Sequence, residues 1–399
     1  MHRLISLAGL VVFVLIAYLL SDNRKKMNWR LIISGLVLQF VFAVAILRTV
    51  PGQYIFDKLR FFITSLISFS QAGSEFVFGA GFREHFFAFS VLPTIIFVSS
   101  LMTVFFYLGI LQKIVEFMAK IMVYVMDTSG SESLATAANI FMGMSEAPLV
   151  IKPYIKSMTR SEIMAMMTGG MATISGATLA AFTGYGANAG HLLTASVISA
   201  PAALVIAKIM VPETETSLTK GTVKIKIPKE DVNVLDAACR GASDGVKLAI
   251  NIAAGLIAFI AFVALLNWLL SFLPEFNGSQ FTLERIFGWL CSPLAWLMGI
   301  EWKDASTVGA LLGKRTVLNE FIAYIDLSKC KDIISPRSFT IATYALCGFA
   351  NFGSIAILIG GLGAIVPEKR TDFARLGLKS MIAGMLACFM TAAIAGMLI

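Results

Sequence analysis

Long apolar runs without a charged residue constrain the fold of this chain more than any other feature. Leu4 to Leu20 and Leu31 to Leu47 each reach the roughly 17 to 25 residues that a helix needs to cross a bilayer. Hydrophobic residues make up 57% of the sequence and charged residues 14%, which excludes a water-soluble domain. Because only helices and closed barrels satisfy backbone polar groups in lipid, these helix-length runs predict an all-α polytopic membrane protein.

About eight spans are predicted, separated by segments that are too polar to cross. Residues 52–88 and Phe281 to Ile300 are typical of interfacial helices and loops, and Pro212 to Asp244 is typical of a cytoplasmic linker. The predicted spans are Leu4–Leu20, Leu31–Leu47, Val91–Ile110, Met164–Phe182, His191–Val211, Val246–Leu273, Phe339–Leu362 and Leu376–Leu398.

The basic residues set the expected orientation. Although the net charge is +8, the Lys and Arg residues cluster in short loops, which indicates membrane topology rather than nucleic-acid binding. The cluster Arg24 to Arg30 after the first span and the loop Pro367 to Arg370 before the last are both expected inside, so both termini are expected outside. The loop Asp326 to Arg337 fits this topology poorly, because it should be external yet has more basic than acidic residues.

Two segments, Ser133 to Ile155 and Ala305 to Ile325, are interrupted near their middle by polar residues. Irregular backbone at membrane depth is tolerated only when it is buried in protein or lines a watery cavity, so both are predicted to be re-entrant hairpins. Their tips match, because Ser145 and Asn319 are favoured helix caps and each is followed at once by glutamate. Pro148 suits a first helical turn, so a half-helix is expected to start at each tip.

The two hairpins belong to a predicted inverted repeat. Each precedes a span with a glycine-rich polar interruption, Gly170 to Gly176 in the first and Gly348 to Ser354 in the second, and a further span closes each unit. Three spans precede the first hairpin and six precede the second, so the units enter the membrane from opposite sides. Interrupted segments in two inverted halves point to a secondary-transporter site near the bilayer midplane.

Glu146 and Glu320 are the candidate site carboxylates, because an ionisable group at membrane depth costs at least about 2.5 kcal/mol unless it is paired or wet. One alternative is a structural ion pair with Lys314 or Arg315; the other is a ligand site. Nearby polar groups and one aromatic face suit a ligand with a ring, hydroxyl groups and N–H groups. These predicted neighbours are Ser145, Thr173, Asn319, Asn351, Ser354 and Phe349.

The run GKRTVLNEFIAY, Gly313 to Tyr324, resembles the signature of the concentrative nucleoside transporter family. That pattern is Gly-x-Lys, three variable residues, then Asn-Glu-Phe and a small residue before an aromatic. ANIFMGMSEAPLVIKPY is similar to the first hairpin of the family, and HLLTASVISAPAALVIAKIMVPETE to its fifth span and exit. The resemblance runs from the first span to the last.

The resemblance implies a homotrimer in the plasma membrane, the inner membrane of a bacterium. Each protomer would have eight spans, two oppositely oriented hairpins, and a transport domain that moves across a trimerising scaffold. The implied scaffold is residues 1–130 and 213–303. The implied transport domain is residues 131–212, with hairpin 1 and spans 4 and 5, and residues 304–399, with hairpin 2 and spans 7 and 8.

The resemblance also places a nucleoside between the tips. It directs Met144, Ser145 and Glu146 toward the base, and Glu320, Asn351 and Ser354 toward the ribose, with Asn319 and Phe349 in the same site. Met144 departs from the family, which commonly has glutamine there. A thioether is at most a weak acceptor whereas an amide both donates and accepts, so base preference cannot be carried over.

The coupling ion is expected to be sodium. Sodium-coupled members use an asparagine, an early hydroxyl of the fourth span and nearby backbone carbonyls; Asn139 and Thr173 occupy those places, with the carbonyls of Met142 and Ile174. Hard oxygen ligands on broken backbone suit a small cation. Proton-coupled relatives tend to lack the asparagine, and proton coupling stays open as the alternative. No other cofactor is expected.

Two remote alternatives come from other classes of protein. A membrane-embedded enzyme would use Glu146 and Glu320 as a carboxylate pair, and an ion channel would line a pore with them. No phosphate loop, nucleophile elbow or metal-ligand spacing supports an enzyme, and the five cysteines lie far apart. The sequence therefore favours a cation-coupled nucleoside symporter that is not an enzyme.

Overall fold

The computed structural model describes residues 2–79, 81–82, 87–221, 231–275, 278 and 280–399. Within these residues all regular elements are helical, apart from one isolated bridge between Ser129 and Lys220. Short turns of other helix types lie at Arg24–Lys26, Phe87–Val91, Ala147–Ile151 and Pro367–Lys369. The α-helices are α1 His2–Leu19, α2 Trp29–Arg48, α3 Val50–Phe78, α4 Leu92–Tyr107, α5 Ile110–Met126, α6 Gly130–Ala138, α7 Lys152–Ile155, α8 Arg160–Ala172, α9 Gly176–Gly184, α10 Ala189–Met210, α11 Val234–Leu270, α12 Leu283–Leu297, α13 Trp302–Val317, α14 Glu320–Lys329, α15 Pro336–Leu346, α16 Phe352–Ile365 and α17 Arg370–Leu398.

The all-helical membrane prediction is confirmed. In the described part of the chain, 7 helical stretches are long and apolar enough to cross a membrane. The predicted span Phe339–Leu362 is not one of them, because it is divided between α15 and α16. The qualifying stretches are His2–Leu19, Trp29–Arg48, Phe87–Tyr107, Arg160–Gly184, Ala189–Met210, Val234–Leu270 and Pro367–Leu398.

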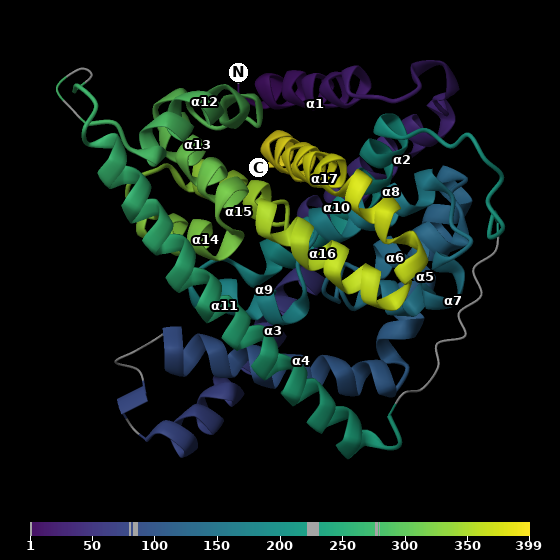
Figure 1. The fold of residues 1–399 in the computed structure, drawn as a ribbon, viewed down its shortest axis with the longest axis horizontal. Coiled ribbons are helices and arrows are strands. Elements are labelled where there is room, and N and C mark those ends of the chain that lie inside the picture. Colours follow the sequence, from purple (N-terminus) through teal and green to yellow (C-terminus); the bar gives the residue numbers. More distant parts are fainter. Residues whose placement is uncertain (1, 80, 83–86, 222–230, 276–277, 279) are drawn as a thin grey trace.

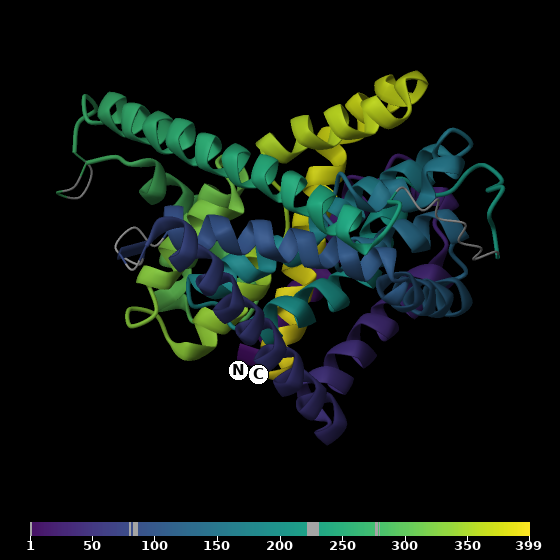
Figure 2. The ribbon, with the colours of Figure 1, turned by 90° about the horizontal axis from the view of Figure 1, so that it is seen from below.

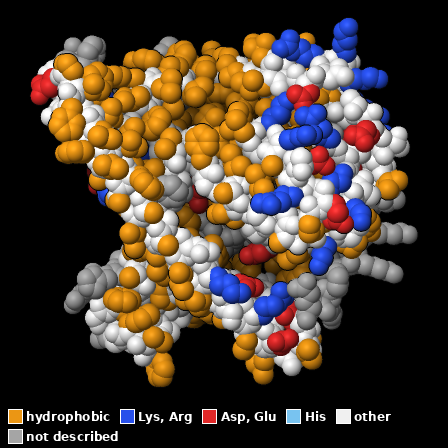
Figure 3. Space-filling model, viewed as in Figure 1, with side chains coloured by type: hydrophobic (Ala, Val, Ile, Leu, Met, Phe, Trp, Pro, Cys, Tyr) orange, Lys and Arg blue, Asp and Glu red, His pale blue; other side chains and the backbone are white. Residues whose placement is uncertain are grey.

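The helices form a buried centre with an exposed apolar rim. In α10 the most apolar stretch is 89% buried, whereas in α11 it is 18% buried, so α10 runs through protein and α11 runs along the outside. Helices α4 and α11 pack side by side across one face, and α17 packs between α1, α8 and α10 (Figures 1 and 2). Hydrophobic side chains gather over the half that holds α11 to α13, and charged ones over the half that holds α5 to α8 (Figure 3). An apolar outer surface of this kind suits contact with lipid.

Two central helices are broken where the sequence predicts. Helix α8 ends at Ala172 and α9 begins at Gly176, with the Ser175 side chain accepting from the Thr178 N–H as a cap. Helix α15 ends at Leu346 and α16 begins at Phe352, capped by Asn351. Each break leaves backbone polar groups without intrahelical partners inside the buried centre. Such groups are available to a ligand.

Two element boundaries differ from the prediction. Helix α11 begins at Val234, inside the segment predicted as linker, because Asn233 caps it and accepts from the Asp236 N–H. Residues 222–230 of that segment lie outside the described residues. The span predicted to end near Ile110 is followed by a further helix, α5, in which Lys120 pairs with Glu116 at 2.7 Å. From sequence alone, the charged residues of an amphipathic helix can be mistaken for a loop outside the membrane.

The start of α8 is held by a reciprocal cap. The Thr159 side chain accepts from the Glu162 N–H at 3.1 Å, and the Glu162 carboxylate accepts from the Thr159 N–H at 2.8 Å. The second oxygen of Glu162 accepts from Ser131 of α6 and from Ser217. These contacts tie the start of α8 to its neighbours.

We expect Thr159→Ala to destabilise the protein by about 1 kcal/mol, because the cap acceptor is lost. Thr159→Ser keeps the hydroxyl and is the matched control. The measurement is the midpoint of thermal unfolding in detergent, which should fall for the alanine variant and stay close to the original for the serine variant. Equal midpoints for the alanine and serine variants would contradict this role of the hydroxyl.

Candidate functional site

The first tip differs from its prediction in detail. Ser145 is not a helix cap; the N-cap residue is Glu146, its side chain caps nothing, and it precedes the tight turn Ala147–Ile151 and the short α7 rather than a long half-helix. The Glu146 carboxylate instead turns back and accepts from the Gly143 N–H at 3.2 Å. Ser145 faces α16, where a Cβ added at Gly361 would lie 3.4 Å from its hydroxyl oxygen. The bond from the Gly143 N–H to the Glu146 carboxylate replaces the expected cap.

The second tip forms as predicted. Asn319 caps α14, and its side chain accepts from the Ile322 N–H at 3.0 Å. Glu320 is only 4% exposed and accepts from the Asn351 side chain at 2.7 Å. Asn351 in turn caps α16 by accepting from the Ser354 N–H at 2.8 Å. The tip and the broken span, which lie apart in sequence, therefore meet through a buried carboxylate.

The remaining polar groups of the second tip lie close to these contacts. Ser354 is buried in the first turn of α16, and Phe349 is half-buried in the turn before it. The Glu320 carboxylate retains acceptor capacity beyond the bond from Asn351, because an ionised carboxylate has about four lone-pair sites. The cluster can therefore accept hydrogen bonds from hydroxyl groups beside an aromatic ring.

The structural ion pair considered for the two glutamates is wrong within the described residues. Lys314 pairs with Asp326 at 2.6 Å and with Glu284 at 3.3 Å. Arg315 donates instead to the Ala345 carbonyl oxygen at 2.7 Å. In the part of the chain that the structure describes, neither cation forms an ion pair with Glu146 or Glu320, so the ligand-site alternative remains for both carboxylates.

The residues expected to hold a cation lie where the first tip meets α8. Asn139 is 1% exposed, and its side-chain N–H donates to the Ala135 carbonyl at 2.9 Å. Its side-chain oxygen is buried and has no hydrogen-bond partner among the described residues. A Cβ added at Gly170 would lie 3.6 Å from that oxygen and 2.8 Å from the Cβ of Met144, so glycine allows the tip to approach α8 closely.

The break between α8 and α9 supplies the other predicted groups. Thr173 is buried and donates to the Gly169 carbonyl at 2.9 Å, which leaves its oxygen lone pairs free to accept. Ile174 is buried in the break itself, and Met142 is half-buried in the turn before the tip. The Gly176 N–H donates to the Phe141 carbonyl at 3.0 Å and so joins the break to that turn. The structure thus brings this group of residues to one place.

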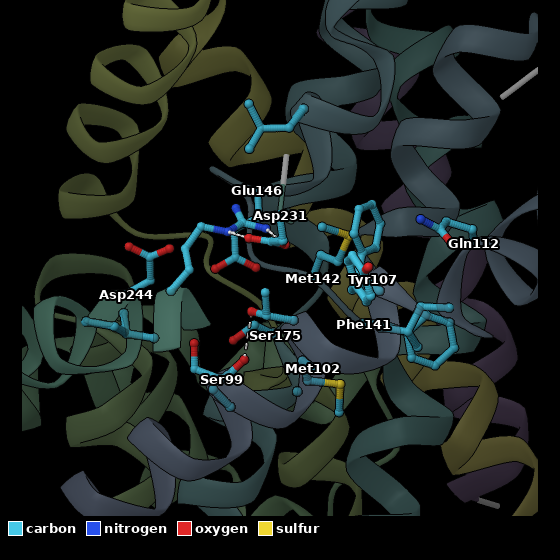
Figure 4. A pocket seen from close by; sticks show the side chains of 18 of the residues that line it. Ser99, Met102, Tyr107, Gln112, Phe141, Met142, Glu146, Ser175, Asp231 and Asp244 are labelled. Atoms are coloured by element: carbon cyan, nitrogen blue, oxygen red, sulfur yellow. Dashed lines mark hydrogen bonds and ion pairs between the residues drawn. The ribbon is translucent and has the colours of Figure 1, made fainter. Parts of the chain in front are cut away.

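A cavity of about 320 Å³ opens beside the first tip (Figure 4). Glu146 and Met142 line it, whereas the predicted residues of the second tip do not. Helices α4, α5 and α11 form the opposite walls, so the cavity separates the first tip from the exposed rim. Aromatic and polar side chains both face it, including those of Ser99, Phe106, Tyr107, Gln112, Phe141 and Ser175.

Sequence reasoning missed the charged wall of this cavity. Arg240 on α11 forms a two-pronged ion pair with Asp231 at 2.6 and 2.7 Å, and both residues line the cavity with Asp244. These residues fall in the segment predicted as linker, in which nothing indicated a site. The available signal was the spacing of Arg240 and Asp244, which places them on one face of a helix.

Broken helices, polar tips and the buried Glu320 carboxylate at the centre of a membrane-embedded helical protein define a secondary transporter. Three sequence profiles match this chain. The profile described as the C-terminus of a Na+ dependent nucleoside transporter matches residues 191–396, its N-terminal counterpart residues 8–81, and a nucleoside recognition "Gate" profile residues 88–189.

Related sequences agree. Solute carrier family 28 member 3 of Eptatretus stoutii is 44% identical over the whole chain, and sodium/nucleoside cotransporter 1 of Rattus norvegicus is 41% identical. The chain spans 61% and 64% of the length of these two relatives. An uncharacterized transporter of Haemophilus influenzae is 41% identical, with 100% of this chain and 98% of that protein covered.

Solved structures agree as well. CNTnw in an inward-facing, substrate-bound state has a TM-score of 0.94 and 39% identity, covering 100% of this chain and 98% of that one. A double variant of CNTnw in an outward-facing state has a TM-score of 0.93 and 38% identity with the same coverage. The chain therefore belongs to the concentrative nucleoside transporter family, whose profile is that of a Na+ dependent transporter.

Proposed function

We propose that the protein is a sodium-coupled nucleoside symporter that imports nucleosides by alternating access. The observation that carries the proposal is the buried Glu320 carboxylate, held by Asn351 at 2.7 Å inside the family signature and free of any ion pair within the described residues. Proton coupling is the alternative. Support for alternating access comes from CNTnw, which has been solved in inward-facing, outward-facing and intermediate states.

The nucleoside would lie between the two tips. Glu320, Asn351 and Ser354 would accept from or donate to the ribose hydroxyls, with Asn319 and Phe349 beside them. Met144, Ser145 and Glu146 would face the base. The polar second tip beside the half-buried Phe349 ring supports this assignment, since sugars need several acceptors and bases need an apolar face. The cavity beside Glu146 would serve as the path between the first tip and water.

Sodium would bind at Asn139 and Thr173 with the carbonyl oxygens of Met142 and Ile174. The buried side-chain oxygen of Asn139, which lacks a partner among the described residues, supports a cation there. Such an oxygen costs free energy unless something occupies it. A neutral oxygen site of this kind suits sodium better than a transition metal.

The architecture would follow from the same proposal. Eight spans would include α15 and α16 as one broken span, and two re-entrant hairpins would enter from opposite sides as an inverted repeat. Residues 131–212 and 304–399 would form the transport domain and residues 1–130 and 213–303 the scaffold of a homotrimer. Both termini would lie outside a bacterial inner membrane. The exposed apolar face of α11 supports an outer scaffold.

Radiolabelled uptake into proteoliposomes tests the proposal. A panel of purine and pyrimidine nucleosides is offered with a sodium gradient, with choline in place of sodium, and with a proton gradient alone. Saturable, sodium-dependent uptake with counterflow is the expected result. Uptake that follows protons and ignores sodium would replace sodium with the proton-coupled alternative. Non-saturable flux would indicate a channel, and altered product would indicate an enzyme.

Met144→Gln should change base selectivity more than ribose recognition. Met144 is 7% exposed in the first tip, and the new amide could both donate to and accept from a base edge. The measurement is competition of uptake by purine nucleosides, pyrimidine nucleosides and free ribose. Met144→Leu is the apolar control and should keep the original order. An unchanged order in the glutamine variant would mean that residue 144 does not face the base.

A further inference from the structure

Arg315 is a fully buried arginine that has no role in the proposed transport site. It lies in the last turn of α13, shortly before the second tip, and is 0% exposed. Its guanidinium lies 5.6 Å from the ring centroid of Phe389 on α17. Its Nε and Nη2 atoms are buried without a hydrogen-bond partner among the described residues. Burying a charge is costly unless it is compensated, so a role for this cation is expected.

One role is visible in its contact with the broken span. Arg315 donates through Nη1 to the Ala345 carbonyl at 2.7 Å, in the last turn of α15. Carbonyls at a helix C-terminus lack intrahelical partners and carry partial negative charge, which a cation satisfies. This end of α15 leads directly into the turn from which Asn351 reaches Glu320. Arg315 therefore fixes the backbone that delivers the Asn351 amide.

A second role is electrostatic. Arg315 in the last turn of α13 and Glu320 at the start of α14 lie five residues apart across the second tip, and both side chains are buried. The other cations of α13 and α14 are occupied, because Lys303 pairs with Glu301 while Lys314 and Lys329 both pair with Asp326. Among the cations of α13 and α14, helices that the structure describes in full, Arg315 thus remains to balance Glu320. In a buried site such an interaction is weakened little by solvent or salt.

The family signature adds a sequence argument. In the pattern Gly-x-Lys, three variable residues, Asn-Glu-Phe, the lysine position corresponds to Arg315 of this chain. Lysine and arginine are both cations, but only arginine has a planar guanidinium with several donors. One donor can bond a carbonyl while the positive charge faces a carboxylate. Charge at this position, more than its shape, is what the two share.

We propose that Arg315 is a positioning residue for ribose recognition, which balances the charge of Glu320 and anchors the turn that carries Asn351. This inference rests on the proposed function and deepens it. Arg315 itself need not touch the nucleoside. Its loss should therefore weaken recognition of the sugar hydroxyls while leaving recognition of the base intact.

The test compares uptake of a ribonucleoside with uptake of its 2′,3′-dideoxy analogue in proteoliposomes. The wild-type protein should prefer the ribonucleoside, and Arg315→Met should lower this preference at least about tenfold, the effect of one charge-assisted hydrogen bond. Uptake of the dideoxy analogue should change little. Arg315→Lys should retain most of the preference, because it retains the charge.

Arg337→Met is the matched control, because Arg337 also donates to a carbonyl near a helix C-terminus, that of Gly396 in α17. Unlike the Arg315–Ala345 bond, this bond is not next to the turn that carries Asn351. Arg337→Met should keep the preference for the ribonucleoside. If Arg315→Met does not assemble, Arg315→Gln, which keeps a donor for Ala345 without the charge, takes its place with the same expected result.

Three outcomes would overturn the inference. They are equal losses for both compounds in the Arg315 variant, the same loss of preference in Arg337→Met, and a wild-type protein that transports both compounds equally. These outcomes are distinguishable from failure of the proposed function itself. In that case the wild-type protein would take up neither compound, with sodium or with protons.

Discussion

Glu320→Gln should lower nucleoside uptake by roughly 10 to 150-fold at substrate concentrations below half-saturation. The amide preserves the volume and can still accept from Asn351, which donates to Glu320 at 2.7 Å in the wild-type protein. The charge is lost, and hydrogen bonds to charged groups contribute about 1.5 to 3 kcal/mol, which corresponds to this range. The measurement is the concentration dependence of uptake in sodium.

The control for this variant is Glu368→Gln, the same chemical change at an exposed glutamate whose ion pair with Lys156 is also exposed. Exposed pairs of this kind contribute little, so uptake should be unaffected. Both variants should insert and elute as the wild-type protein does in detergent. Wild-type uptake by the Glu320 variant at low substrate concentration would remove Glu320 from the nucleoside site.

The helix caps and breaks are the part of the site that can be predicted from sequence. Asn319 and Asn351 cap α14 and α16 because an asparagine oxygen satisfies N–H groups within the next three residues, and such local chemistry is visible in the sequence. The break between α8 and α9 is equally local. The cap predicted at Ser145 is absent because the carboxylate of its neighbour Glu146 accepts from the Gly143 N–H. Residue preferences for cap positions do not reveal which of the two side chains bonds the backbone.

Contacts between distant segments cannot be predicted in the same way. Arg315 bonds Ala345, and Asn351 bonds Glu320, across separations of 30 and 31 residues. The cavity beside Glu146 has walls from α4, α5 and α11, whose packing is not encoded in any one of them. The ion pair Asp231–Arg240 in its wall is interpreted from sequence as part of a polar linker, because charged residues usually lie outside the membrane. The periodicity of hydrophobic residues predicts where helices lie, but it does not reveal which polar faces of these helices contact one another.

Asn139→Ala should raise the sodium concentration for half-maximal uptake at least tenfold or remove sodium dependence altogether. The side-chain oxygen of Asn139 is buried and unpartnered among the described residues, so the substitution removes a candidate ion ligand without breaking a bond to that oxygen. The amide N–H that bonds the Ala135 carbonyl is lost as well, but this contact lies within one helical turn. Sodium titrations of uptake at fixed pH, repeated as pH titrations without sodium, measure the effect.

The nucleoside should respond to the same change through linkage. If sodium and nucleoside bind cooperatively, the coupling free energy is reciprocal, so weaker sodium binding must also weaken nucleoside binding at subsaturating sodium. At saturating sodium the half-saturation value for nucleoside should return toward that of the wild-type protein, whereas a direct nucleoside contact would stay impaired. Asn23→Ala, the same change in an exposed turn, is the control and should leave both titrations unchanged. A wild-type protein indifferent to sodium would show that Asn139 holds no coupling ion, and the proton-coupled alternative would then stand.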